Sequence, residues 1–301
     1  MKRNILSIFL ILACFLIIDN IGGWGMKKAV ENTQDLITPK LEYLFKHCQE
    51  DIITIGTSRC HSHYVPSIIA DSTHLSVYNG GIQASSSILS HYIVLSNILE
   101  KHKPQLILLD VSIEDYRKEE NDFQSIGFFA PYFGLSKNAD SVYQDAGVYY
   151  SYLFSHLFRY NAKAIPILAG LIKENKENQP DGFLPLNAIP FKETTHIIKK
   201  EIPSQIKLKY FERFIQQCNE ANIKLFIAVS PHYYGETQDA YEPLEKIAEK
   251  YNIPFKNYNN TKTDLLHPCN FKDSYHLSYR GAQLYSQQVA SDLKRFITGN
   301  P

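Results

Sequence analysis

The chain has 301 residues, enough for one large domain or two, and its 31 Lys and Arg balance 31 Asp and Glu. With no net charge and no basic stripe, the sequence argues against a nucleic-acid partner. The 20 Tyr and 17 Phe residues fit a large core first and a carbohydrate-facing cleft second.

The first 26 residues are predicted to form a membrane anchor. A positive start at Lys2 and Arg3 precedes an apolar run over 5–18, which is shorter than the ~20 residues of a full span. Residues 21–26 can extend the run and place Trp24 at a membrane interface.

Three interpretations of this segment stay open, and the favoured one is an uncleaved signal anchor. A cleaved signal peptide is the second, although no small-x-small cleavage site follows the run. A lipoprotein signal ending at Cys14 is the third, and the apolar residues 15–18 argue against it. All three predict that residues 27–301 are exported to the periplasmic or extracellular side, while the positive start stays in the cytoplasm.

The five cysteines include no CxxC pair, so a zinc ribbon or a redox motif is not supported. Their spacings do not resemble a disulfide framework. For the four exported cysteines, Cys48, Cys60, Cys218 and Cys269, we therefore predict buried free thiols, with Cys60 a small core residue.

Beyond the anchor, residues 27–47 have apolar positions at helical spacing and are expected to pack as a stalk. Strands and helices then alternate. The expected strands are 52–55, 75–78, 106–110, 224–230 and 254–258. The expected helices are 64–69, 85–99, 204–221, 240–251 and 279–297.

This alternation predicts a parallel sheet with right-handed crossovers in a three-layer α/β/α sandwich. The rhythm breaks over residues 113–200, where 143–172 is helical and aromatic-rich and 174–187 is polar. We predict a helical insertion there, which either shapes a substrate pocket or is a passive surface excursion.

Two motifs lie near opposite ends of the predicted sandwich's sequence. Asp51-Ile-Ile-Thr-Ile-Gly-Thr-Ser-Arg-Cys60 is a buried strand followed by a turn, which places Ser58 at the carboxyl edge of the sheet. Asp273-Ser-Tyr-His276 precedes the final helix. The two motifs could therefore meet at one edge.

Gly56-Thr57-Ser58 resembles the first block of the SGNH (GDSL-type) hydrolases, with Thr where that block often has Asp. Asp273-x-x-His276 resembles the last block, and the layout of residues 50–297 follows the family. The resemblance implies a flavodoxin-like fold. Behind a single N-terminal membrane segment, Gly-Thr-Ser-Arg is similar to the membrane-anchored branch, which includes the D-alanine transfer protein of teichoic acids and acetyl-transfer proteins of exopolysaccharide export.

The resemblance implies a catalytic triad. A serine hydroxyl is a poor nucleophile until a base takes its proton and a third group orients that base. We expect Ser58 to be the nucleophile, His276 the base and Asp273 the orienting carboxylate.

The family also implies an oxyanion hole made by the serine N–H, a glycine N–H from the second block and an Asn from the third. Here the glycine would be Gly81 or Gly80. The third block departs from the pattern, because residues 110–115 contain no Gly-x-Asn-Asp. Asn79 or Ser112 could take the place of the missing amide.

Other residues near these motifs are expected to shape the pocket. Arg59 binds an anionic substrate group or, as we favour, braces the loop by pairing with Asp110 or Glu114. His232 and Tyr233 follow the fourth central strand and are expected to line the pocket. His61 and His63 form an HxH pair without an evident third ligand, so no metal site is predicted. No cofactor is implied.

We therefore predict a serine esterase or acyltransferase acting on O-acyl groups of a cell-surface or exported polysaccharide. Its substrates would be the glycan or an acyl carrier, and a membrane-bound acyltransferase is a candidate partner. The alternative is a catalytically degenerate domain that binds glycan or a membrane acyltransferase. A third reading is a thioesterase-like helper of such an enzyme.

Overall fold

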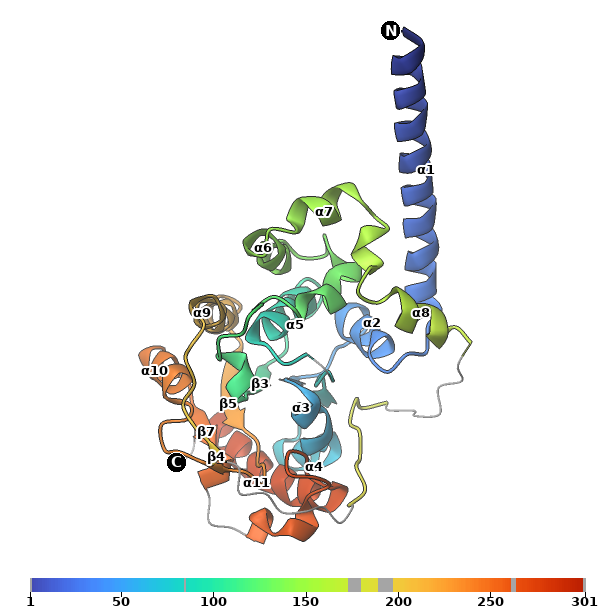
Figure 1. Ribbon diagram of the computed structural model, residues 1–301. Helices are drawn as coiled ribbons and strands as arrows, with labels where there is room; N and C mark the ends of the chain where they lie inside the picture. Colours follow the sequence, from blue (N-terminus) through green and yellow to red (C-terminus); the bar gives the residue numbers. More distant parts are fainter. Residues whose placement is uncertain (1, 84, 173–179, 189–196, 261–263, 300–301) are drawn as a thin grey trace. The chain divides into compact units, whose positions relative to one another are not determined.

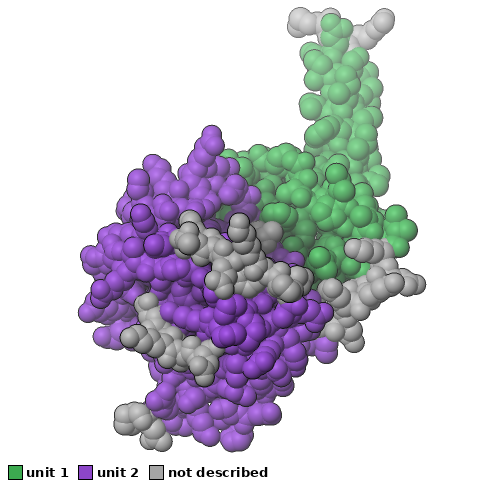
Figure 2. Space-filling view, turned by 60° about the horizontal axis from the view of Figure 1, so that its bottom comes forward, with its two compact units in different colours: residues 1–43, 126–177 green, residues 44–125, 178–301 purple. Residues whose placement is uncertain are grey.

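The computed structural model describes residues 2–83, 85–172, 180–188, 197–260 and 264–299 (Figure 1). The chain forms two compact units, which Figure 2 shows in different colours. One unit comprises residues 1–43 and 126–177, and the other comprises residues 44–125 and 178–301.

The second unit contains a five-stranded, fully parallel sheet with the order β2-β1-β3-β5-β7. Its strands are β1 Ile52–Ile55, β2 Val77–Asn79, β3 Leu106–Asp110, β5 Lys224–Val229 and β7 Phe255–Asn257. Counted along the chain, this is the 2-1-3-4-5 order of flavodoxin-like folds. The predicted α/β fold with a central parallel sheet is confirmed.

Helices cover both faces of this sheet, so β1 and β3, which are apolar except for Thr54 and Asp110, are buried at every position. One face carries α3 Ser58–His63, α4 Pro66–Thr73 and α11 Tyr279–Thr298. The other carries α5 Ile88–Leu99, α9 Gln205–Glu220 and α10 Glu242–Lys250. Strand side chains such as Ile52, Leu108 and Phe226 join α4 and α11 in one hydrophobic core.

Shorter elements complete this unit. A second, two-stranded parallel sheet pairs β4 Ile197–Ile198 with β6 Gly235–Glu236. The 3₁₀ helices are η1 Ile113–Asp115, η4 Tyr258–Asn260, η5 Asp264–Leu266 and η6 Pro268–Asn270. None of the five cysteines is in a disulfide. Cys48, Cys60 and Cys218 are buried as predicted, whereas Cys269 is exposed, which corrects the prediction for that residue. Cys14 is exposed on α1.

The first unit is helical. Its elements are α1 Lys2–Asn32, the first residues of α2 Thr38–Lys46, η2 Ile126–Tyr132, α6 Lys137–Asp145, α7 Tyr149–Phe154, η3 Phe158–Tyr160 and α8 Ala164–Gly170. Within the described residues, α1 is the one helix long and apolar enough to cross a membrane, as an anchor or a signal sequence.

The predicted insertion is divided between the two units. Its middle, residues 126–177, groups with the N-terminal helix, whereas residues 113–125 and 178–200 group with the sheet. The helical stretch expected over 143–172 is broken into short helices, beginning at Gly147, whose φ of 73° ends α6. Parts of the predicted polar segment and of its surroundings, 173–179 and 189–196, lie outside the described residues.

Candidate active site

Ser58 is the first residue of α3, directly after the turn that follows β1. Thr57 caps the helix, because its Oγ1 accepts the Arg59 N–H at 3.3 Å. Gly56 is required at this turn, since a Cβ there would lie 2.9 Å from the Asp110 carbonyl oxygen. The serine is half-buried at the carboxyl edge of the sheet, where folds of this kind bind their ligands.

His276 and Asp273 lie on the loop before α11. The Asp273 Oδ1 accepts the backbone N–H groups of Tyr275 and His276, both at 2.8 Å, so the carboxylate shapes its own loop. His276 Nδ1 lies 3.1 Å from each Asp273 oxygen. Its Nε2 lies 2.9 Å from Ser58 Oγ, so the structure brings the three predicted residues together.

The burial of His276 favours a neutral imidazole. Burial lowers its pKa below the ordinary value of 6.5, although Asp273 acts in the opposite direction. Burial raises the pKa of Asp273, but the N–H of Tyr275 and the contacts with His276 outweigh it and leave this pKa lowered. An ionised Asp273 can only accept, so Nδ1 carries the proton and Nε2 presents a lone pair to the Ser58 hydroxyl. This arrangement can activate a serine nucleophile.

The glycine N–H groups nominated for the oxyanion hole already donate within the protein. Gly80 donates to the Thr54 carbonyl and Gly81 donates to Asn79 Oδ1, both at 3.0 Å. Close packing explains both glycines, since a Cβ on Gly81 would lie 2.2 Å from the His61 nitrogen. These contacts revise the interpretation of the two glycines as free donors.

Asn79 and Ser112 are engaged as well. The Asn79 Nδ2 donates to the Cys60 and Tyr64 carbonyls, both at 2.8 Å, and thereby closes the end of α3. The N–H and hydroxyl of Ser112 both donate to Asp115 Oδ2, which forms a capping box. Neither side chain is a spare donor in this structure, so a role in an oxyanion hole would require each to give up these contacts. Of the nominated donors, only the Ser58 N–H has no acceptor in the described part of the chain.

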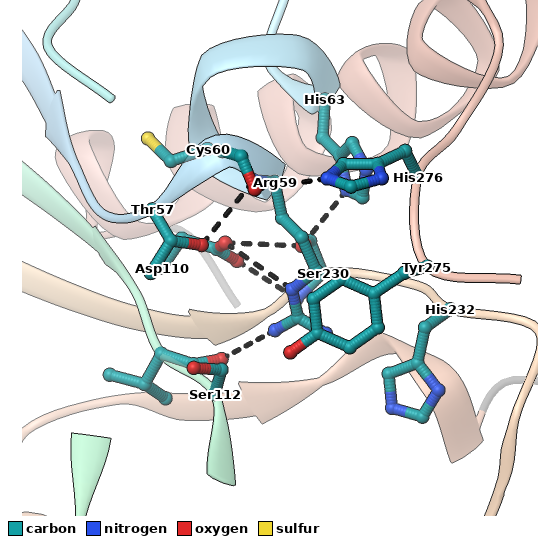
Figure 3. Close-up of polar contacts among 12 residues, drawn as sticks. Thr57, Arg59, Cys60, His63, Asp110, Ser112, Ser230, His232, Tyr275 and His276 are labelled. Atoms are coloured by element: carbon teal, nitrogen blue, oxygen red, sulfur yellow. Dashed lines mark hydrogen bonds and ion pairs between the residues drawn. The ribbon is translucent and has the colours of Figure 1, made fainter. Parts of the chain in front are cut away.

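Arg59 braces the site. It is fully buried, its Nη2 donates to the Val111 carbonyl at 2.7 Å, and its Nε lies 4.0 Å from Asp110. Tyr275 covers it, with the guanidinium carbon 5.1 Å from the ring centroid (Figure 3). Burial opposes the charge, but Tyr275 and Asp110 together raise the Arg59 pKa. These contacts fit the bracing interpretation. The alternative, binding of an anionic substrate group, stays a prediction, because Arg59 Nη1 has no hydrogen-bond partner among the described residues.

His232 and Tyr233 pack against the loop that carries Asp273 and His276. The His232 ring is buried, lies 3.3 Å from Glu236 and stacks on Tyr275 at 6.4 Å between centroids. The Tyr233 N–H donates to the Ser274 carbonyl at 2.9 Å, and its ring packs on Phe271. These contacts give both residues a supporting role beside the Asp273–His276 loop, and the expectation that they line the pocket stays a prediction.

Sequence reasoning missed Tyr275, although it lies inside the Asp-x-x-His motif. Its hydroxyl donates to Glu114 at 3.0 Å, and its ring borders a cavity of about 440 Å³. The other lining residues combine one aromatic ring with charged and aliphatic side chains: Ile113, Glu114, Arg117, Ile197, Ile198, Lys199, Glu201 and Tyr234. The position of Tyr275 between the two motif residues was the available signal.

A second polar chain lies deeper in the unit. The Ser230 hydroxyl donates to Asp110 Oδ2 at 3.2 Å, and His63 Nδ1 lies 3.0 Å from the same Ser230 Oγ. The His63 Nε2 accepts the N–H of Leu277, the residue directly after His276, at 2.9 Å. Figure 3 shows His63, Ser230 and Asp110 beside His276. His63 is thus engaged at both nitrogens, and in the described residues no three His, Cys, Asp or Glu side chains converge as metal ligands.

The fold and these contacts define an open, parallel α/β protein with a serine–histidine–aspartate grouping at the carboxyl edge of its sheet. No protein-family model and no curated protein matches the chain.

Several solved structures are similar over most of their length. A protein described as a lipolytic protein of the G-D-S-L family from Desulfitobacterium hafniense DCB-2 has 10% identity and a TM-score of 0.39, covering 80% of this chain and 97% of its own. The acetyl xylan esterase AlAXEase has 12% identity and a TM-score of 0.38, covering 82% and 98%. A protein described as an acylhydrolase from Bacteroides fragilis NCTC 9343 has 11% identity and a TM-score of 0.39, covering 86% and 98%. At these scores the likeness carries no argument about function.

Proposed function

We propose that the protein is an SGNH-type serine esterase or acyltransferase that uses Ser58, His276 and Asp273. The observation that carries this proposal is the unbroken contact series Asp273–His276–Ser58, built from motifs 218 residues apart, with Ser58 Oγ 2.9 Å from His276 Nε2. The composition of the two motifs, which resemble the first and last blocks of that family, supports the same assignment.

In the proposed reaction His276 Nε2 takes the Ser58 proton as the Oγ attacks an ester carbonyl. Asp273 stabilises the imidazolium that forms. His276 then returns the proton to the departing alcohol, which leaves an acyl group on Ser58. Water completes hydrolysis by attacking this ester, whereas a sugar hydroxyl attacking the same carbonyl completes transfer.

We further propose that the substrate is an O-acylated cell-surface or exported polysaccharide, or a carrier that acylates one. The apolar N-terminal helix supports a location at the membrane, and the positive Lys2 and Arg3 favour export of the sheet unit. The cavity beside Tyr275, lined by two tyrosine rings and charged side chains, has a composition suited to a polar ring-shaped ligand. A membrane-bound acyltransferase remains the candidate partner for transfer.

One observation favours the second candidate, a domain that binds glycan or such a partner without catalysis. The Gly80, Gly81 and Asn79 donors are occupied, and each missing oxyanion donor weakens transition-state binding by about 3–4 kcal/mol. An enzyme built on this site therefore has to recruit a further donor when substrate binds.

A serine-directed fluorophosphonate separates the two candidates. The enzyme proposal expects covalent labelling of the Ser58 peptide in the full chain, detected by mass spectrometry, and none in Ser58→Ala. Ser291→Ala, an exposed serine on α11, is the matched control and should label normally. Absence of labelling, with no turnover of an aryl acetate and retained glycan binding, would favour the binding domain.

The polysaccharide assignment needs its own test in cells. Loss of the acyl content of surface glycan on Ser58→Ala, with normal content in Ser291→Ala, is the expected result. If Ser58 labels but the glycan is unchanged, the nucleophile stands and the proposed substrate is wrong.

A further inference from the structure

The membrane helix α1 carries a carboxylate inside its apolar stretch. The apolar run over residues 5–18 is ~20 Å long at about 1.5 Å per residue, which is too short for a hydrocarbon core of about 30 Å. A full span has to continue through Asp19 to about Trp24, whose side chain is 64% exposed. A span of this kind must satisfy the Asp19 carboxylate within the protein.

The insertion supplies the missing donors. Asp19 is 5% exposed, and it accepts the Ser155 hydroxyl as well as the backbone N–H groups of His156 and Leu157 at 2.7 and 3.1 Å. The same loop touches the next turn of α1, since a Cβ on Gly23 would lie 2.5 Å from His156 Cβ. The loop is therefore fixed to α1 at the depth of residues 19–23.

Depth along α1 places this loop inside the bilayer. If the span ends near Trp24, Asp19 lies five residues from that end, or about 8 Å below the surface of the hydrocarbon core. Whatever is attached to Asp19 shares that depth. The insertion loop and its flanking helices thus enter the membrane together with α1.

The flanking helices have the surface that such a position requires. Along residues 149–172, large apolar side chains are exposed to an extent unusual for a water-facing surface, with Phe154 at 73%, Ile165 at 82% and Ile172 at 90%. We name the set the insertion patch: Tyr150, Leu153, Phe154, Leu157, Phe158, Ile165, Leu168, Leu171 and Ile172.

Each helix of the patch has a polar or packed side and an apolar exposed side. On α7 the Tyr150 and Phe154 rings stack at 6.1 Å, one turn apart. On α8 the buried Ile167 and Gly170 face Thr33, whose hydroxyl donates to the Ile167 carbonyl at 2.8 Å. The exposed Ile165 and Leu168 lie on other positions of α8, as in a helix that lies at a membrane interface.

We propose that the insertion patch is a second membrane contact, with α7, η3 and α8 lying in the interface of the leaflet where α1 ends. The partner is the lipid bilayer itself. The reason for choosing lipid is continuity with the α1 span. The insertion patch is attached to α1 at Asp19, so the lipid that surrounds residues 5–18 is also next to the patch. A protein partner would instead have to compete with that lipid for the patch.

Trp24 is the only tryptophan in the chain, which permits a direct depth measurement. The full-length protein is reconstituted in phosphatidylcholine vesicles, and quenching by brominated acyl chains is compared with quenching by aqueous acrylamide. Trp24 is the depth reference. In a Trp24→Phe background, Phe154→Trp and Ile165→Trp move the probe to the insertion patch, and Gln144→Trp moves it to an exposed polar position of α6.

We expect the F154W and I165W probes to lose fluorescence to brominated lipid to an extent comparable with Trp24 and to be shielded from acrylamide. The Q144W probe should show the reverse. Circular dichroism checks that each variant is folded. If the two patch probes behave like Q144W, the patch faces water or a protein partner, and the proposal is overturned. Absence of lipid quenching at Trp24 would overturn it as well, because the depth of Asp19 rests on that span.

Discussion

Two groupings of serine, histidine and aspartate lie in the sheet unit, and their distances are nearly the same. Ser58 Oγ is 2.9 Å from His276, and Ser230 Oγ is 3.0 Å from His63. The two groupings differ in which group donates its proton to the aspartate. In the first grouping Asp273 faces the histidine, whereas in the second Asp110 accepts the hydroxyl proton of the serine itself.

Access differs as well. Ser58 is half-buried and His276 has 24% of its side chain exposed, whereas Ser230 and His63 are fully buried. The lone pair of His63 Nε2 is occupied by the Leu277 N–H, so this histidine has no base function to offer Ser230. A serine–histidine distance alone therefore does not identify a nucleophile. The direction of each proton and access to substrate decide it.

The largest expected effect separates the two serines. Ser58→Ala and His276→Ala should each lower kcat/KM for an aryl acetate by more than about 10⁴-fold, because the pair acts as one unit. The double variant should be little worse than either single variant. Steady-state kinetics of the three proteins measure this, with Ser291→Ala as the unchanged control. Additive losses would mean that the two residues act separately.

Asp273→Asn should cost less, about 10²-fold to 10⁴-fold in kcat, since an orienting carboxylate is lost while nucleophile and base remain. Asp110→Asn is the counterpart in the buried grouping, and its main effect should be on stability rather than kcat. Comparison of kcat with the unfolding midpoint for both variants checks the contrast. A purely structural Asp273 would lower the midpoint and leave kcat per folded molecule unchanged.

Most of the sheet was predictable because its signals are local. Continuous apolar runs such as 106–110 predict buried parallel strands. Their alternation with helices predicts a sheet with helices packed on both faces. The Ser58 and His276 motifs were also visible, since each follows or precedes a strongly patterned element. The short β4–β6 pairing was not predictable, because two-residue strands have no periodicity.

The oxyanion donors and pocket residues were harder to predict, because sequence does not show which donors are already occupied. Asn79 closes the end of α3, and Ser112 caps η1. The partners of these two side chains are atoms of other segments or of the following turn, and the sequence pattern around Asn79 and Ser112 does not reveal them. The bracing role of Arg59 was easier to predict. An arginine next to the end of a buried strand, with acidic residues nearby, is expected to pair with one of them and hold the loop.

The pH dependence of the proposed esterase reaction tests the protonation of the exposed grouping. The proposed mechanism requires a neutral His276, whose pKa is lowered from 6.5 mainly by burial. The midpoint of the acid limb of kcat/KM should therefore lie below pH 6.5. Below that midpoint, kcat/KM should decrease about tenfold for each pH unit. Asp273 raises this pKa, so Asp273→Asn should move the limb to still lower pH. A limb above pH 6.5 would contradict the neutral-histidine assignment.

The smallest effect on activity is expected from the buried grouping. Ser230→Ala removes the acceptor of the His63 Nδ1–H and leaves a buried donor without its partner, at a cost of about 1–3 kcal/mol of unfolding free energy. Catalysis should change little, because His63 acts on His276 only through the Leu277 backbone. Urea denaturation and aryl acetate turnover are measured on the same samples, with the exposed Ser291→Ala as the matched control for loss of a hydroxyl. A large loss of kcat at unchanged stability would place Ser230 in the reaction, and the two groupings could then no longer be distinguished by access and proton direction.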